Sequence, residues 1–394
     1  MSLLLSNAQL ILDPSRGVVP GWLALRDGMI KDLGALGDEP AAEVTVIDCG
    51  GDFIAPGLVD IHCHGAVGRD ATEASEEAFG TILGAHARCG TTTAVLTTVA
   101  APLPEMLAVL RMTESWRDGW GMARLAGIHL EGPWFSRKRR GAHDPKQLRD
   151  PRESETSALL EYARVIRRVT LAPELPGALE TIRFLIGAGI AVSAGHSDAT
   201  EKEAFAGFGA GITQVTHLHN AMSSLRKTDP PRRGLAEAAL ENQGMLCELI
   251  ADGVHVSPDL LRETLKARGW KHLALVSDAT AGCGLPEGSG FRLGDLDCVV
   301  RGKAAWTGEG TGRCLAGSTA PLFAGIRTMV EQAGATISEA VAMASLVPAR
   351  SLGMEQKVGS LKIGKEADLI RFSPNWEIKG VWIGGEGVEG IGYG

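Results

Sequence analysis

Apolar and polar segments alternate regularly through the middle of the chain, in a pattern typical of strands followed by helices. Eight apolar segments are predicted to be strands, at residues 54–62, 91–98, 125–132, 169–174, 191–196, 214–220, 245–253 and 273–279. Helices are predicted between them, for example at 74–89 and 257–268. The second of these begins with Ser257 as N-cap and Pro258 at the first helical position. The alternation predicts an α/β fold, a (β/α)₈ TIM-type barrel.

The two ends of the chain have a different pattern, in which short segments alternate polar and apolar residues between turn residues. Residues 1–52 contain three such segments, and a second set follows the helical stretch at 336–352. We therefore expect a small β-sandwich domain formed by both termini, from 1–52 and 353–394. It would flank a barrel domain at 53–352.

Composition narrows the class of protein. Lys and Arg total 39 against 47 Asp and Glu, a net charge of −8, and 44% of the residues are hydrophobic. This excludes a disordered chain and an electrostatic nucleic-acid binder. No apolar run is long enough for a membrane span and no signal peptide is recognisable, so a cytoplasmic protein without a membrane partner is expected. The seven cysteines contain no CxxC pair, which argues against a disulfide framework and a cysteine zinc site.

Histidines and acids gather at the C-terminal ends of the predicted strands, where the active sites of barrels lie. His62 and His64 end the first strand two positions apart, so they share a face while Cys63 points away. The other strand-end residues are Glu131, His196, His217, His219 and Asp278. Imidazole and carboxylate groups suit Zn²⁺ and related ions, so the pattern predicts a metal site. His86 and His272 fall outside strand ends and are expected to be structural.

A series of motifs carries a resemblance to a known family. The stretches are APGLVDIHCHG, GIHLEGPWFS, KRRGAHDP, AGHSDAT, THLHNAM, ADGVHV, LVSDATA and LAGS, between residues 55 and 318. In these motifs the chain resembles the N-acetylglucosamine-6-phosphate deacetylases of the amidohydrolase superfamily. The resemblance implies removal of the acetyl group from N-acetyl-D-glucosamine 6-phosphate, giving glucosamine 6-phosphate and acetate. It also implies a homodimer.

The resemblance assigns roles to individual residues. Glu131, His196 and His217 match the principal metal ligands, and His62 and His64 match a pair that allows a second ion, so one or two divalent ions are expected. Zn²⁺ is the first choice, but the same ligands accept Fe²⁺, Mn²⁺ or Co²⁺. The residues matching substrate contacts are Ala142, His143, Asn220, Ala221 and His255.

The chemistry of amide hydrolysis agrees with these roles. Zn²⁺ can lower the pKa of a bound water from about 16 to about 7 and polarise a carbonyl oxygen. Asp278, which matches the catalytic Asp of the family, would take the proton of the water and pass it to the departing amine. His143 is our candidate for stabilising the tetrahedral oxyanion.

One position departs from the family. An Arg that contacts the phosphate is expected six residues after Met222, where this chain has Thr228. Because Thr cannot provide the bidentate contact of Arg, a non-phosphorylated or other N-acyl hexosamine, such as N-acetylgalactosamine 6-phosphate, is an alternative substrate. Basic residues that can substitute lie nearby at Arg226, Lys227, Arg232 and Arg233, and the run 137–140 either is solvated or steers an anionic substrate.

Two other functions compete with deacetylation. A cyclic amide hydrolase would bridge two metals with a carboxylated Lys after the fourth strand, where this chain has LAPE. A non-catalytic sugar-binding barrel would be expected to lack Asp278 or a ligand. The remaining polar strand-end residues, His129, His219 and Glu174, are expected to pack, to contact substrate or to orient a ligand.

Overall fold

The core of the molecule is an eight-stranded parallel barrel. The computed structural model describes residues 2–40, 45–226, 228, 230–302, 304–308 and 313–390. The barrel strands are neighbours in chain order. They are β6 (Leu58–Cys63), β9 (Thr91–Thr98), β10 (Arg124–Glu131), β11 (Ile166–Leu171), β12 (Ala191–Ala194), β13 (Gln214–Val215), β14 (Leu246–Ile250) and β15 (Leu273–Val276). Each overlaps one of the eight predicted strands, so the predicted barrel is confirmed.

The barrel nearly closes between its first and last strands. Just beyond β15, the backbone N–H of Asp278 donates to the carbonyl of His62 (2.9 Å), and that of His64 donates to Ala279 (2.7 Å). These bonds continue the sheet across the seam past the ends of the regular strands. Closure therefore brings the His62–His64 pair beside Asp278.

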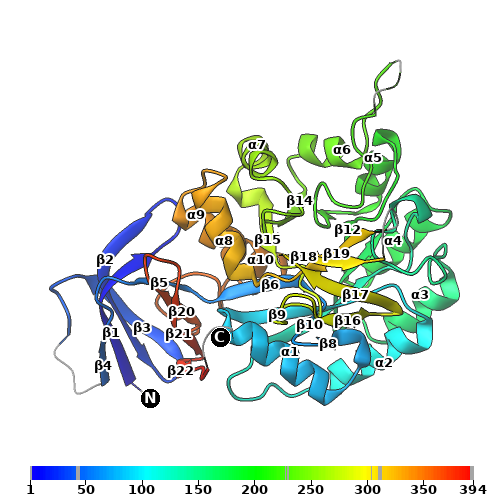
Figure 1. Ribbon diagram of the computed structural model, residues 1–394. Coiled ribbons are helices and arrows are strands. Elements are labelled where there is room, and N and C mark those ends of the chain that lie inside the picture. The colour runs from blue at the N-terminus through cyan, green and yellow to red at the C-terminus, as the bar shows by residue number, and fades with distance from the viewer. Residues whose placement is uncertain are drawn as a thin grey trace.

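Helices surround the barrel (Figure 1). They are α1 (Glu76–Arg88), α2 (Leu103–Ser115), α3 (Glu153–Leu160), α4 (Ala178–Gly187), α5 (Glu201–Ala210), α6 (Leu235–Glu241), α7 (Pro258–Arg268), α8 (Leu322–Glu331), α9 (Ile337–Ala344) and α10 (Leu346–Ser351). The predicted start of α7 is confirmed, because the side chain of Ser257 accepts from the N–H of Leu260. Among the described residues, no helix has the length and apolar character needed to cross a membrane.

Both ends of the chain build the second domain, as predicted. Its sheet contains β1 (Ser2–Ile11), β2 (Val18–Arg26), β3 (Met29–Ala35), β4 (Thr45–Asp48), β5 (Phe53–Pro56), β20 (Leu369–Phe372), β21 (Ile378–Ile383) and β22 (Glu386–Gly387). In Figure 1 the blue N-terminal strands lie beside the red C-terminal strands, joined where β5 pairs antiparallel with β20. Although β5 lies beyond residue 52, it belongs to this sheet and continues into β6 through Gly57.

A four-stranded antiparallel sheet follows the last barrel strand and was not anticipated from the sequence. It consists of β16 (Gly290–Leu293), β17 (Leu296–Arg301), β18 (Ala304–Thr307) and β19 (Cys314–Ser318). A short ribbon, β7 (Gly65–Ala66) with β8 (Arg69–Asp70), follows β6. The four-stranded sheet buries Phe291 and Val300 in a small core of its own and supplies part of the wall of the cavity described below.

Candidate metal centre and active site

A cavity of about 320 Å³ opens at the C-terminal ends of the barrel strands. It collects most of the predicted site residues in one place. Those lining it are His64, Glu131, Ala142, His143, His196, His217, Asn220, Ala221, His255 and Asp278, while His62 lies fully buried beneath them. Residues distant in sequence therefore meet at the position that the barrel predicts.

Glu131, the last residue of β10, lies at the centre of the cluster. Its Oε1 is 3.1 Å from Nε2 of His217 and 3.2 Å from Nε2 of His196. Its Oε2 is 3.4 Å from Nε2 of both His64 and His143. With Nε2 of His62 at 3.6 Å from Oε1, one buried carboxylate faces five imidazole nitrogens, an arrangement that a divalent cation would stabilise.

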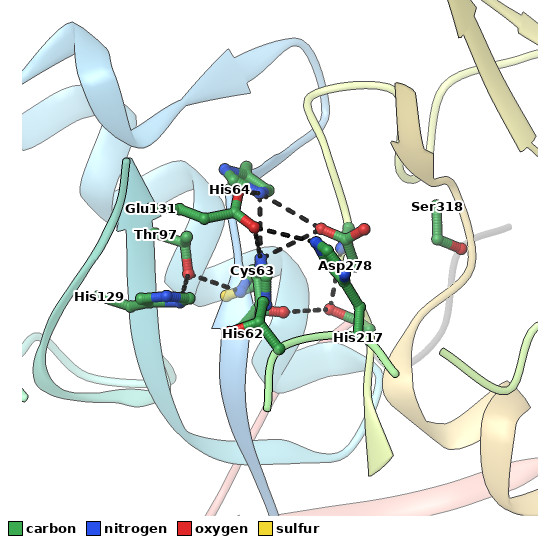
Figure 2. Close-up of polar contacts among 12 residues, drawn as sticks. His62, Cys63, His64, Thr97, His129, Glu131, His217, Asp278 and Ser318 are labelled. Carbon is green, nitrogen blue, oxygen red and sulfur yellow. Dashed lines mark hydrogen bonds and ion pairs between the residues drawn. The ribbon is translucent and has the colours of Figure 1, made fainter. Parts of the chain in front are cut away.

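The first-strand pair completes the cluster from the other side (Figure 2). Nε2 of His62 and Nε2 of His64 are 3.3 Å apart, and they lie 3.3 and 3.2 Å from Oδ1 of Asp278. The thiol of Cys63 instead contacts the backbone carbonyl of Val95 (3.7 Å), as the alternation of a strand requires.

Backbone conformation helps to aim three of these side chains. His196, His217 and Asp278 each follow a strand end with φ of 49°, 31° and 48°, in the left-handed region that non-glycine residues rarely adopt. Such conformations typically cluster at functional sites, where the surrounding structure holds them. The turns direct all three side chains into the cavity.

In His196 and His143 the hydrogen bond of the far ring nitrogen, Nδ1, shows whether Nε2 can bind a metal or donates a hydrogen bond. Nδ1 of His196 lies 3.0 Å from the carbonyl oxygen of Arg139 and must donate to it, which leaves the Nε2 lone pair free for a metal. In His143, Nδ1 accepts from the backbone N–H of Ala100 (3.1 Å), so a neutral ring carries its proton on Nε2. His143 therefore presents a hydrogen-bond donor to the cavity.

Electrostatics agree with a site for a cation. Burial opposes ionisation of Glu131 and Asp278, but the surrounding imidazoles outweigh it, holding the pKa of Glu131 well below its usual value and lowering that of Asp278 to about 2. Burial is the larger effect at His196 and His217 and lowers the pKa of each, which favours the neutral form that binds metals. At His64 the neighbouring carboxylates outweigh burial and raise the pKa to about 9.

The residues present fit a divalent metal. Glu131, His196 and His217 offer one set of N and O donors, and His62 and His64 offer a second set that shares Glu131. The potential metal-ligand atoms of His62, His64 and Glu131 all lie within 4.8 Å of one another. Those of Glu131, His143 and His196 do as well. The described part of the chain thus has buried clusters able to hold a metal, and bridging by Glu131 would allow two ions.

Opposite the cluster, the cavity presents unpaired polar groups suited to a sugar. Nδ1 of His255 bonds to Asp252 (2.7 Å), while its buried Nε2 has no partner among the described residues. The same is true of the amide Nδ2 of Asn220. Ala221 and Ala142 line the cavity with small side chains. These groups can serve as hydrogen-bonding partners for hydroxyl or phosphate oxygens.

Two basic residues of the 137–140 run also line the cavity. Lys138 and Arg139 form ion pairs with Asp198, at 3.3 and 3.0 Å. Arg226 pairs with the same carboxylate. Three cations held by a single anion leave a net positive charge at the cavity mouth, in keeping with an anionic substrate.

The side chain at the position of the missing Arg bonds within its own loop. The hydroxyl of Thr228 donates to the carbonyl of Pro230 (2.7 Å), within its own loop. Arg233 forms ion pairs with Glu201 and Glu241, and Lys227 lies outside the described residues.

Several weaker candidates bond to neighbouring groups. The contacts are His129 with Thr170 (2.6 Å), His219 with Thr264 (2.8 Å), Glu174 with Ser197 (2.7 Å) and His86 with the carbonyl of Gly65 (3.2 Å). His129 also packs edge-on against the ring of His62, with ring centroids 4.7 Å apart. It is a neighbour of the cluster and does not face the cavity.

Sequence reasoning missed Glu248 and Arg168, which lie within β14 and β11 beneath the cluster. Nδ1 of His62 lies 3.0 Å from Oε2 of Glu248. The available signal for Glu248 was a charged residue inside the predicted strand 245–253, whereas Arg168 directly precedes the predicted strand 169–174 and lies within the longer β11 of the structure. A buried charge in such a strand requires a partner.

Comparisons with known proteins agree with this geometry. The model of the amidohydrolase family matches residues 53–388. The chain is 35% identical to an N-acetylglucosamine-6-phosphate deacetylase of Vibrio furnissii, over 84% of this chain and 82% of that protein. It is 34% identical to an N-acetylgalactosamine-6-phosphate deacetylase of Escherichia coli O157:H7, over 93% and 95%.

A solved structure gives the same result. A variant of N-acetyl-D-glucosamine-6-phosphate deacetylase from Mycobacterium smegmatis, in complex with N-acetyl-D-glucosamine-6-phosphate, matches with a TM-score of 0.88 and 32% identity. The match covers 98% of this chain and 99% of that one. The chain therefore belongs to the amidohydrolase family.

Proposed function

We propose that this chain is a metal-dependent deacetylase that hydrolyses N-acetyl-D-glucosamine 6-phosphate to glucosamine 6-phosphate and acetate, a reaction of amino-sugar catabolism. The observation that carries the proposal is the position of Asp278. Its ionised carboxylate contacts the edge of a His and Glu cluster that fits a divalent metal, in a cavity large enough for a sugar. Deacetylases of amino-sugar phosphates among the relatives support it.

In the proposed mechanism, a divalent metal held by Glu131, His196 and His217, with His62 and His64 available for a second ion, supplies Lewis-acid chemistry. Asp278 accepts a proton from the attacking water and returns it to the nitrogen of the departing amine.

His143 supplies a second contribution. Its Nε2–H donates to the oxygen of the acetamide as negative charge develops there. The backbone N–H of Ala100 donates to Nδ1 of His143 and so holds the ring in this orientation before the substrate binds.

The far side of the cavity recognises the sugar phosphate in this proposal. Nε2 of His255 accepts from a hydroxyl of the substrate, the amide of Asn220 donates to a substrate oxygen, and the backbone at Ala221 approaches the phosphate. Lys138 and Arg139 supply the positive charge that an Arg at the position of Thr228 would otherwise provide.

The galactosamine epimer is the second candidate substrate. The relative from Escherichia coli O157:H7 that carries this activity in its name aligns over 93% of the chain. A cyclic amide hydrolase is disfavoured, since Glu131 occupies the centre of the cluster and the fourth strand leads to Glu174, which bonds to a neighbouring Ser.

Three further expectations belong to the proposal. Zn²⁺ is the resident metal, with Fe²⁺, Mn²⁺ or Co²⁺ able to replace it. The protein acts in the cytoplasm as a homodimer, as the family resemblance implies. Metal analysis and light scattering of the purified protein test the metal and the oligomeric state.

The decisive experiment measures acetate release by the zinc-loaded protein. The substrates are N-acetylglucosamine 6-phosphate, its galactosamine epimer and non-phosphorylated N-acetylglucosamine, compared by kcat/KM. We expect the first to be preferred by at least about tenfold over the free sugar, the effect of one charge-assisted contact. Preference for the free sugar would retain the chemistry but reject the phosphate, and absence of acetate from all three would refute the proposal.

A further inference from the structure

An ion pair crosses the interior of the barrel beneath the candidate metal site. Arg168 on β11 contacts Oε1 of Glu248 on β14, and the two side chains are 3% and 1% exposed. The pair links the fourth barrel strand to the seventh. Burying two charges is costly, and an apolar pair of similar volume is often equally stabilising. Stability alone therefore gives little reason for a charged pair at this position.

The second oxygen of Glu248 contacts two residues of the donor cluster at once. Oε2 accepts from Nδ1 of His62 at 3.0 Å and from the backbone N–H of His217 at 3.2 Å. These residues come from different strand ends, and the Nε2 of each lies near Oε1 of Glu131, at 3.6 Å for His62 and 3.1 Å for His217. A single carboxylate thus holds the side chain of one candidate ligand and the main chain of another.

The contact between Glu248 and Nδ1 of His62 matters because the ring of His62 has a second possible hydrogen-bond acceptor, Asp278. Its Nε2 lies 3.3 Å from Oδ1 of Asp278, so a ring with its proton on Nε2 would bond to Asp278 and offer no lone pair to a metal. An acceptor at Nδ1 selects the other tautomer and leaves Nε2 bare. The contact of Arg168 with Oε1 leaves Oε2 of Glu248 turned toward His62 and His217.

We propose that Glu248, anchored by Arg168, is a positioning residue for the metal site, holding His62 with Nε2 toward Glu131 and His64 and fixing the turn that carries His217. The inference rests on the metal site of the proposed function and adds a residue that acts on the metal through its ligands. Its tests measure metal binding, so they are independent of which substrate the enzyme hydrolyses.

Two double variants separate positioning from support of the fold. Arg168→Met with Glu248→Leu removes both charges and leaves Nδ1 of His62 without an acceptor. Arg168→Met with Glu248→Gln also removes both charges but keeps one acceptor oxygen for His62. Ser193→Ala is the control, because this buried hydroxyl bonds to Thr216 (2.6 Å) and to no residue of the metal cluster.

Zinc affinity and stoichiometry are measured by competition with a chromophoric chelator, and the melting temperature of each metal-free variant is recorded. We expect the Leu variant to bind zinc about 10- to 100-fold more weakly, the usual effect of removing a group that orients a ligand, with partial recovery in the Gln variant. The control should match the parent. Equal affinities in the parent and both double variants would overturn the proposal and leave a purely structural ion pair.

A measurement on the unaltered protein covers the case in which the variants do not fold. Long-range ¹H–¹⁵N spectra of histidine-labelled, zinc-loaded protein report the protonation of each ring nitrogen, with His62 assigned by comparison with His62→Gln. The proposal requires a proton on Nδ1 and zinc on Nε2. An unprotonated Nδ1, or zinc bound to Nδ1, would refute the positioning role of Glu248 even if the protein releases acetate. The expected spectrum together with no acetate release would count against the proposed function alone.

Discussion

Replacing Asp278 by Asn is the most direct test of the chemistry, because the change keeps the size of the side chain and removes its charge and basicity. Oδ1 of Asp278 lies 3.3 and 3.2 Å from Nε2 of His62 and His64, at the edge of the metal cluster. General-base catalysis contributes about 10²–10⁴-fold to a rate, or about 3 to 5 kcal/mol in the barrier. We expect kcat to fall by that factor.

The assay couples acetate release to metal analysis of the same sample. Asp278→Asn should retain bound zinc through Glu131, His196 and His217, so the loss of rate is not a loss of metal. Asp368→Asn is the control, since it removes a buried carboxylate that pairs with Arg124, next to β20 and outside the cavity. It should lower stability and leave kcat unchanged. If kcat of Asp278→Asn stays within about threefold of the parent with zinc bound, the assigned role is refuted.

The pH profile gives an independent test of the same residue. The pKa of Asp278 is lowered to about 2, so its carboxylate stays ionised throughout the usual assay range. A loss of activity as the pH falls from 7 to 5 must then be caused by protonation of other groups. The metal-binding histidines are the candidates, because a protonated imidazole does not bind the metal. We expect zinc content and rate to decline together on dialysis across this range. A rate that declines while zinc remains bound would contradict this account.

Three further predictions concern other parts of the molecule. Lys138→Gln and Arg139→Gln should each raise KM for the phosphorylated sugar about tenfold and leave that for the free sugar unchanged, and equal effects on both sugars would exclude a phosphate role. Phe372→Ala should destabilise the protein by about 3 to 5 kcal/mol in urea unfolding, with unchanged kcat, because the ring is buried against three other aromatic rings where the terminal sheet meets α8. Burial lowers the pKa of His219 in the folded protein from 6.5 to about 4. Between these two pH values the unfolded chain binds a proton that the folded protein does not, so the free energy of unfolding falls as the pH falls from 6.5 toward 4. His219→Gln should reduce that slope, and identical slopes would refute this account.

The barrel was predictable because its eight strands carry strong local signals. In β9, the sequence TTTAVLTT combines β-branched residues with complete burial, and its bounds match the prediction residue for residue. The four-stranded sheet at 290–318 was missed because its strands are short, include charged residues and derive their stability from packing on one another. The sequence of this region therefore does not distinguish four short strands from a long loop.

The candidate site was predictable in composition but not in detail. Parallel strands end at the same rim, so the position of Glu131 after one strand and of His196 after another is sufficient to predict that they meet. Which ring nitrogen faces the cavity depends on backbone partners such as Arg139 and Ala100, whose placement no local pattern encodes. Glu248 was missed for the same reason, since its three partners, Arg168, His62 and His217, are distant in sequence.

Charge balance within the barrel connects these observations. Glu131, Asp278 and Glu248 are the buried acids whose carboxylates contact imidazoles of the cluster, and Arg168 pairs with Glu248. Three negative charges against one positive charge leave an excess of two, which a divalent ion neutralises. The same excess of negative charge is felt at His64, where Asp278 and Glu131 outweigh burial and raise the pKa to about 9. Because Arg168 neutralises Glu248, the barrel can hold a third carboxylate that positions ligands without adding to the negative charge that the metal would balance.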